Sequence, residues 1–181
     1  MKNRTENVFF VFFLLIAIFS RFLPLKLPNV EFFSSLIAFT ILLQDKKKFL
    51  YAIPLLVIFS DVLLSFKVPF MIKWEIIVFV SWFVVILVQY AVSGKKILNI
   101  ISMELLGTLA FFLVSNSLVF FMFDFYPKSF LGFFACLLAG LPFLRNQIIY
   151  NFFFSFLVYG TIRLLEHGKV PAENKLKNEN P

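Results

Sequence analysis

The sequence predicts an all-α integral membrane protein, a compact bundle of six or seven transmembrane helices. Of its 181 residues, 61% are hydrophobic and 15% are charged, whereas a soluble domain has about 45–50% and about 25%. A domain of this size has too small an interior to bury the additional hydrophobic residues, so lipid is the simplest environment for them. The apolar residues form seven runs within residues 1–165, separated by short loops that carry basic residues, as the cytoplasmic loops of membrane proteins do.

The first three runs cover residues 8–25, 30–43 and 49–66. The first follows a short basic start, as in a signal peptide, but no small-residue cleavage pattern follows, so we expect a retained helix. Pro24 and Pro28 then break the chain. Because the second run has only 14 residues, it crosses a membrane only with tilt or local thinning, or packs as a partial span.

The fourth run, residues 74–92, is a clear transmembrane helix with Trp74 and Tyr90 at its ends, where aromatic residues face the membrane–water interfaces. The fifth run, residues 98–123, has 26 residues, enough to tilt across the bilayer or to begin among the headgroups. A break at Tyr126 and Pro127 follows it.

The sixth and seventh runs cover residues 130–144 and 147–165, and Pro142 lies near the end of the sixth. Because proline removes a backbone donor and clashes with the preceding turn, we expect one helix to end there. Residues 166–181 form a charged tail without apolar spacing, which we expect to be disordered.

The basic loops predict the orientation. With residues 1–7 in the cytoplasm and every run crossing, the loops at residues 45–48 and 94–96 and Arg145 are also cytoplasmic. Seven crossings leave the Lys-containing tail outside, whereas six return it to the cytoplasm. The short runs 30–43 and 130–144 are the candidates for a run that does not cross.

Several function classes are excluded by composition. The net charge of +7 lies in loops and termini, not on one face of a domain, so we expect no nucleic-acid partner. One cysteine, Cys136, and one histidine, His167, exclude an internal disulfide and a His/Cys metal site. No hydrolase, metalloprotease or nucleotide-binding motif occurs, so we expect neither an enzyme nor a cofactor.

Polar side chains within the apolar runs are the candidate ligand contacts, because such groups are costly in hydrocarbon unless protein or water satisfies them. Asp61 is either a substrate or coupling-ion contact or an interfacial acid in a salt bridge. Asn116 contacts either a ligand or a neighbouring helix. Arg145 either forms an anion site beside a helix N-terminus or is a plain cytoplasmic arginine. The predicted ligand-binding set is Asp61, Asn116, Tyr126, Arg145 and Asn146.

Two further patterns concern helix packing. Glu104, Thr108 and Ser115 share one helical face, which predicts either a stripe toward the bundle interior or an interfacial glutamate in a first turn. Gly132 and Gly140 share a rough face with Cys136 between them, which favours a close helix contact.

A set of motifs across roughly residues 8–162 resembles a group of small bacterial membrane proteins of unknown function. The matching elements are Arg21, Pro28-Asn29, Pro54, Ser60-Asp61, Phe111-Phe112, Asn116, Tyr126-Pro127, Gly132 and Leu141-Pro142-Phe143-Leu144-Arg145-Asn146. That group in turn is similar to the substrate-binding S components of energy-coupling-factor (ECF) transporters. The resemblance implies an ECF S-component-like fold of six helices.

The resemblance also implies a membrane-embedded subunit that binds a small molecule for uptake. Such a subunit works with a transmembrane coupling subunit and ATPases and has no nucleotide site of its own. We expect it in the bacterial plasma membrane with its N-terminus in the cytoplasm. The alternative is a scaffold of an envelope assembly, like the rod-shape membrane subunits. A closed polar pocket joining distant runs favours binding, whereas polar residues paired between helices without a cavity favour the scaffold.

Overall fold

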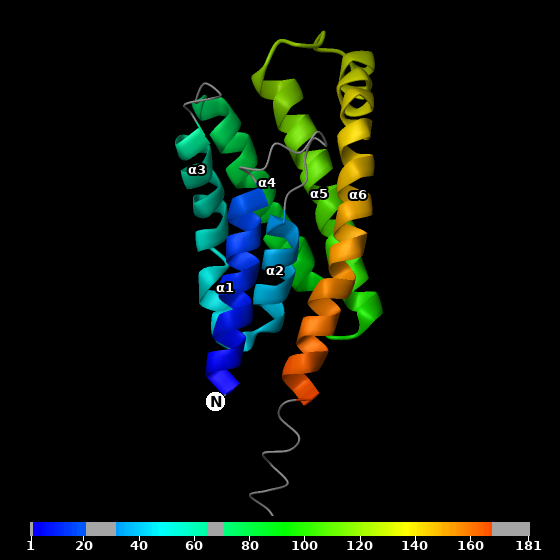
Figure 1. The fold of residues 1–181 in the computed structure, drawn as a ribbon. Helices are drawn as coiled ribbons and strands as arrows, with labels where there is room; N and C mark the ends of the chain where they lie inside the picture. Colours follow the sequence, from blue (N-terminus) through cyan, green and yellow to red (C-terminus); the bar gives the residue numbers. More distant parts are fainter. Residues whose placement is uncertain (1, 21–31, 65–70, 168–181) are drawn as a thin grey trace, which may run out of the picture.

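The computed structural model describes residues 2–20, 32–64 and 71–167, and the first-loop residues Arg21, Pro24 and Pro28 lie outside them. Within these ranges the chain forms six α-helices, one 3-10 helix and no strand. The helices lie side by side in a bundle (Figure 1). They are α1 (Lys2–Ser20), α2 (Phe33–Leu42), α3 (Ala52–Leu64), α4 (Ile72–Ala91), α5 (Ile97–Met122) and α6 (Phe130–His167), with the 3-10 helix η1 (Gln44–Phe49) between α2 and α3.

The short helix α2 lies at the centre of the bundle. Every residue from Phe33 to Leu42 is buried, and α2 contacts α1, α4, α5 and α6. Ten residues rise only about 15 Å, about half the hydrocarbon thickness. The second apolar run therefore forms a helix too short to cross a hydrocarbon core, and it is apolar all round because helices enclose it on every side.

Three of the helices that the structure describes, α4, α5 and α6, are long and apolar enough to cross a membrane. Their outer faces carry many exposed large hydrophobic side chains, such as Phe121, Leu131 and Phe153. A soluble monomer rarely exposes so much contiguous apolar surface.

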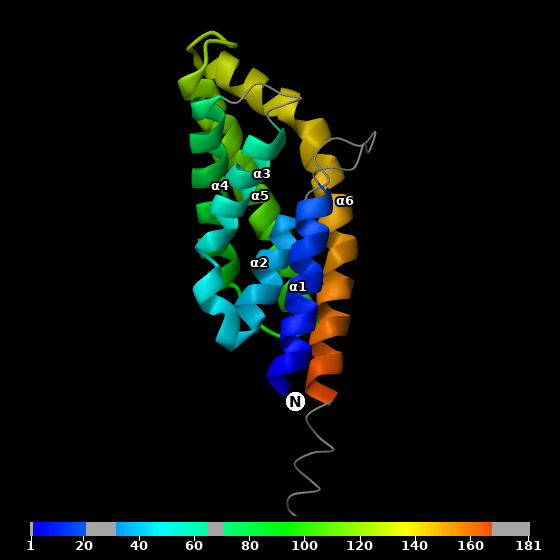
Figure 2. The same ribbon diagram turned by 60° about the vertical axis from the view of Figure 1, so that its left-hand side comes forward.

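The expected helix end at Pro142 is wrong. The sixth and seventh runs form the single 38-residue helix α6, with Pro142 inside it. The helix bends between its yellow and orange halves (Figure 2). Because α6 packs along α5 on both sides of the bend, neighbouring side chains stabilise it where proline removes one backbone hydrogen bond. The described chain therefore has six α-helices.

The break at Tyr126 and Pro127 is a true helix end, since α5 ends at Met122 and α6 begins at Phe130. The Lys128 ammonium group donates to the carbonyl oxygens of Phe120 and Phe123 at the C-terminal end of α5. A cation there satisfies carbonyls that have no partner within the helix and favours the negative end of its dipole.

Basic segments gather at one end of the bundle. The start of α1, η1, the turn between α4 and α5, and the end of α6 all lie toward the lower end in Figure 1, whereas the α5–α6 connection lies at the upper end. Arg145 does not join them, because it precedes Arg163 by 18 residues of α6, or about 27 Å. The expectation that Arg145 lies on the same side as the basic loops is therefore wrong.

Candidate functional site

A buried polar network links the centre of the bundle, and Glu104 lies in its middle. Glu104 is 1% exposed, although it carries a carboxyl group. The Ser34 hydroxyl donates to Glu104 Oε2 at 2.6 Å, and Gln89 Nε2 donates to Ser34 Oγ at 2.8 Å. One serine hydroxyl thereby joins α2, α4 and α5.

Thr108 extends the network to α6. Its hydroxyl donates to the backbone oxygen of Glu104 at 2.7 Å, and Asn151 Nδ2 donates to Thr108 Oγ1 at 2.6 Å. Thr108 and Asn151 are both buried. The stripe with Glu104 and Thr108 therefore faces the bundle interior, and the interpretation of Glu104 as an interfacial first-turn acid is wrong.

A glycine makes room for the network. A Cβ atom on Gly107 would lie 2.8 Å from Gln89 Nε2, closer than real Cβ contacts allow. Because Gly107 has no side chain, Gln89 passes between α4 and α5 to reach Ser34. Sequence reasoning missed Gln89 and Ser34 as site residues, although a lone amide at 89 and paired serines at 34 and 35 within apolar runs were visible signals.

Three buried side-chain oxygens in this cluster have no hydrogen-bond partner. They are Ser35 Oγ, Gln89 Oε1 and Glu104 Oε1. Ser34 has one hydroxyl hydrogen, which it gives to Glu104, so the Gln89 amide must present its NH₂ to Ser34 and leave its oxygen free. A network that is otherwise paired thus retains two acceptor oxygens, on Gln89 and Glu104, and one hydroxyl, on Ser35, without a partner among the described residues.

A separate cavity of about 320 Å³ lies between α4, α5 and α6. Its walls are mainly apolar and aromatic, with polar side chains at three positions, Ser115, Asn116 and Gln147. The aromatic lining residues that the structure describes are Trp74, Phe111, Phe112 and Phe143. Asn116 Nδ2 donates to the Phe112 carbonyl at 2.8 Å, which holds its amide against the wall.

Helix α5 packs closely on α6 beside this cavity, at Asn116. A Cβ atom on Gly140 would lie 2.7 Å from Asn116 Oδ1, and the Cys136 thiol lies 3.5 Å from the Asn116 carbonyl oxygen. The close helix contact expected from Gly132, Cys136 and Gly140 is therefore confirmed at Cys136 and Gly140, whereas Gly132 lies against Pro127 in the α5–α6 connection.

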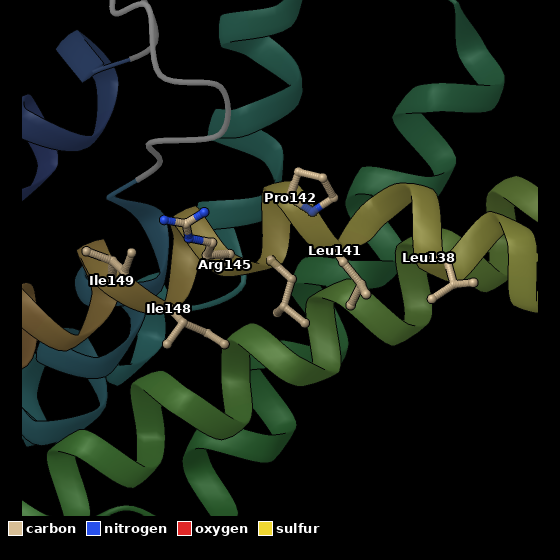
Figure 3. Close-up of a pocket in the computed structure, with 7 residues that line it drawn as sticks. Leu138, Leu141, Pro142, Arg145, Ile148 and Ile149 are labelled. Atoms are coloured by element: carbon tan, nitrogen blue, oxygen red, sulfur yellow. The ribbon is translucent and has the colours of Figure 1, made fainter.

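A larger, shallow groove of about 650 Å³ runs along α6 around Pro142 (Figure 3). The described residues that line it all belong to α6, and Arg145 is the charged one among them. Arg145 is exposed. Because α6 continues through Pro142, neither Arg145 nor Asn146 lies beside a helix N-terminus, so the helix end on which the anion-site alternative depended is absent.

The five predicted ligand contacts do not converge on one site. Asn116 lines the cavity and Arg145 the outer groove, while Asn146 belongs to neither lining. Tyr126 lies in the α5–α6 connection, and Arg145 lies 15 residues, or about 22 Å, into the helix that follows. Asp61 is half-buried in α3, which packs against α4.

The described residues hold no cluster of three or more His, Cys, Asp or Glu side chains able to bind a metal ion. No curated protein and no solved structure matches the chain. One family model matches residues 1–173, nearly the whole length, including all six helices. The chain therefore belongs to DUF6580, a family of unknown function.

Proposed function

We propose that this chain is a membrane-embedded subunit that binds a small molecule, as the resemblance to ECF S components implies. The observation that supports this most strongly is the 320 Å³ cavity between α4, α5 and α6. Small-molecule sites are concave, have volumes of about 300–1,000 Å³, and combine apolar or aromatic walls with a few polar groups. The cavity has that size and composition.

The lining residues suggest the chemistry of the ligand. Aromatic walls favour a flat or apolar body, and the Gln147 amide, which makes no hydrogen bond within the described residues, offers both a donor and an acceptor to its polar edge. Asn116, with its donor turned to Phe112, presents its amide beside Gly140. Transport would require a coupling subunit and ATPases.

We further propose that the bundle spans the bacterial plasma membrane with its basic end in the cytoplasm. Three long apolar helices and the exposed apolar outer surface support insertion. Basic residues near short loops favour the cytoplasmic side. Because the start of α1 and the end of α6 lie at this basic end, both termini of the helical bundle are assigned to the cytoplasm.

Native mass spectrometry of the protein purified from its own host in mild detergent tests binding. We expect a retained small molecule that is lost from Gln147→Leu and Asn116→Leu variants, which remove the polar groups of the cavity. Asn146→Leu is the matched control, because it removes a neighbouring amide outside the cavity lining. Equal retention by Gln147→Leu and Asn146→Leu would contradict the proposed site.

A scaffold of an envelope assembly is the second candidate, and the buried network favours it. Pairing of Ser34 with Glu104 and of Asn151 with Thr108 joins helices without any ligand. This is what a structural role predicts for buried polar groups. Purification without a small molecule but with a co-purifying envelope protein would favour the scaffold over the binding subunit.

A further inference from the structure

We propose that the Glu104 cluster is a binding site for one monovalent cation, a sodium ion or a proton. This site is separate from the aromatic cavity and does not depend on the proposed small-molecule function. The proposal rests on a juxtaposition: Glu104 Oε1, Gln89 Oε1 and Ser35 Oγ, on three different helices, are buried and have no hydrogen-bond partner among the described residues.

Two of the three oxygens belong to side chains of one hydrogen-bonded group. Glu104 and Gln89 both hydrogen-bond to the Ser34 hydroxyl. Glu104 Oε1 and Gln89 Oε1 therefore belong to the same carboxyl and amide groups that contact Ser34. Ser35 follows Ser34 directly in α2. Ser35, Gln89 and Glu104 are each at least nine-tenths buried, and they lie on α2, α4 and α5 respectively.

The charge of the cluster indicates a single positive partner. In the described chain, the side chains that hydrogen-bond to the Glu104 carboxyl or to Ser34 are neutral, and no ion pair reaches Glu104. An ionised carboxylate buried in hydrocarbon without a positive partner is very costly. One carboxylate with neutral amide and hydroxyl oxygens forms a hard, singly charged donor set.

Either cation supplies what the oxygens lack. A sodium ion would accept electron pairs from Glu104 Oε1, Gln89 Oε1 and Ser35 Oγ together. A proton on Glu104 Oε1 would turn that atom into a donor toward a neighbouring acceptor. In both cases the negative charge is neutralised. The sodium ion would serve all three oxygens, whereas the proton pairs Glu104 Oε1 with one of the other two.

The test measures thermal unfolding of the purified full-length protein in nanodiscs, with sodium chloride against choline chloride at equal ionic strength. A ligand that binds only the folded state raises its melting temperature. If sodium binds, we expect a sodium-dependent rise in melting temperature. That rise disappears in Glu104→Gln, shrinks in Ser35→Ala, and persists in the surface control Glu166→Gln.

Infrared spectroscopy distinguishes the proton. If the cation is a proton, no sodium effect appears, but the wild-type protein shows the C=O stretch of a protonated carboxyl at neutral pH. That band is absent from Glu104→Gln and weakened or shifted in Ser35→Ala, which keeps the carboxyl group. If the protein shows no sodium-dependent shift and also no protonated Glu104 band at neutral pH, the proposal is overturned.

Discussion

At the residue scale, single small groups hold the helices together. The Ser34 hydroxyl is the shared partner of Glu104 and Gln89, so three helices meet at one oxygen. The buried serines Ser60, Ser81 and Ser155 bond only within their own helices; the Ser81 hydroxyl, for example, donates to the Ile77 carbonyl one turn earlier. The two kinds of serine have similar burial but different consequences when they are removed.

Replacing Ser34 with alanine should therefore be costly. It leaves a carboxyl oxygen and an amide group buried without partners, and each such group costs about 1–3 kcal/mol. We expect Ser34→Ala to lower the free energy of unfolding in mixed micelles by at least that amount. Ser81→Ala should change it by less than about 1 kcal/mol. Equal losses for the two variants would show that Ser34 does not join the helices.

Glycines provide a second prediction at this scale. A Cβ atom on Gly132 would lie 2.0 Å from the Pro127 carbonyl oxygen, a backbone atom that cannot rotate away. We expect Gly132→Ala to open the α5–α6 connection and to destabilise the protein by about 1–3 kcal/mol. A Cβ atom on Gly160 meets nothing within 4 Å, so Gly160→Ala should be neutral or stabilising by up to about 1 kcal/mol. Thermal unfolding followed by circular dichroism compares the two, and a Gly132→Ala variant as stable as Gly160→Ala would refute the close contact.

At the element scale, α2 and α6 show what apolar patterning reveals. The 14-residue second run already indicated that it could cross a bilayer only with tilt or local thinning, or pack as a partial span, and its helix α2 has only ten residues. Pro142 misled the same reasoning, since proline ends helices in water but is tolerated inside membrane-type helices packed against neighbours. Whether a proline ends or bends a helix depends on packing partners far along the chain, which the local sequence does not contain.

The bend of α6 should depend on Pro142. Spin labels at the exposed positions Leu131 and Leu164, in a Cys136→Ala background, measure it. A straight helix would hold these positions about 50 Å apart along its axis. We expect a shorter distance in the parent protein and a longer one after Pro142→Ala, whereas Leu138→Ala should leave it unchanged. The same distance with and without Pro142 would mean that packing alone bends the helix.

At the scale of the whole molecule, the sequence predicted the helical class and the apolar runs but not the site. Asn116 could be chosen from its surroundings alone, because an amide within a Phe-rich helix needs a partner or a cavity. Glu104 was seen, but its burial was only one of two alternatives, since that depends on where α2 lies. Gln89 and Ser34 meet across 55 residues. Such pairing follows from the packing of four helices and cannot be derived from spacing along one of them.

The proposed small-molecule function and the proposed cation site both assume that the bundle is inserted in a bilayer. Cysteine accessibility tests this insertion most directly. Ser129 in the α5–α6 connection and Lys96 before α5 are exposed and lie at opposite ends of the bundle. Each is replaced by cysteine in a Cys136→Ala background and treated with a membrane-impermeant maleimide. We predict that Ser129→Cys is labelled in intact spheroplasts and that Lys96→Cys is labelled only after permeabilisation. Labelling of both positions from outside, or recovery of the protein in the soluble fraction, would contradict a membrane-spanning bundle with a cytoplasmic basic end.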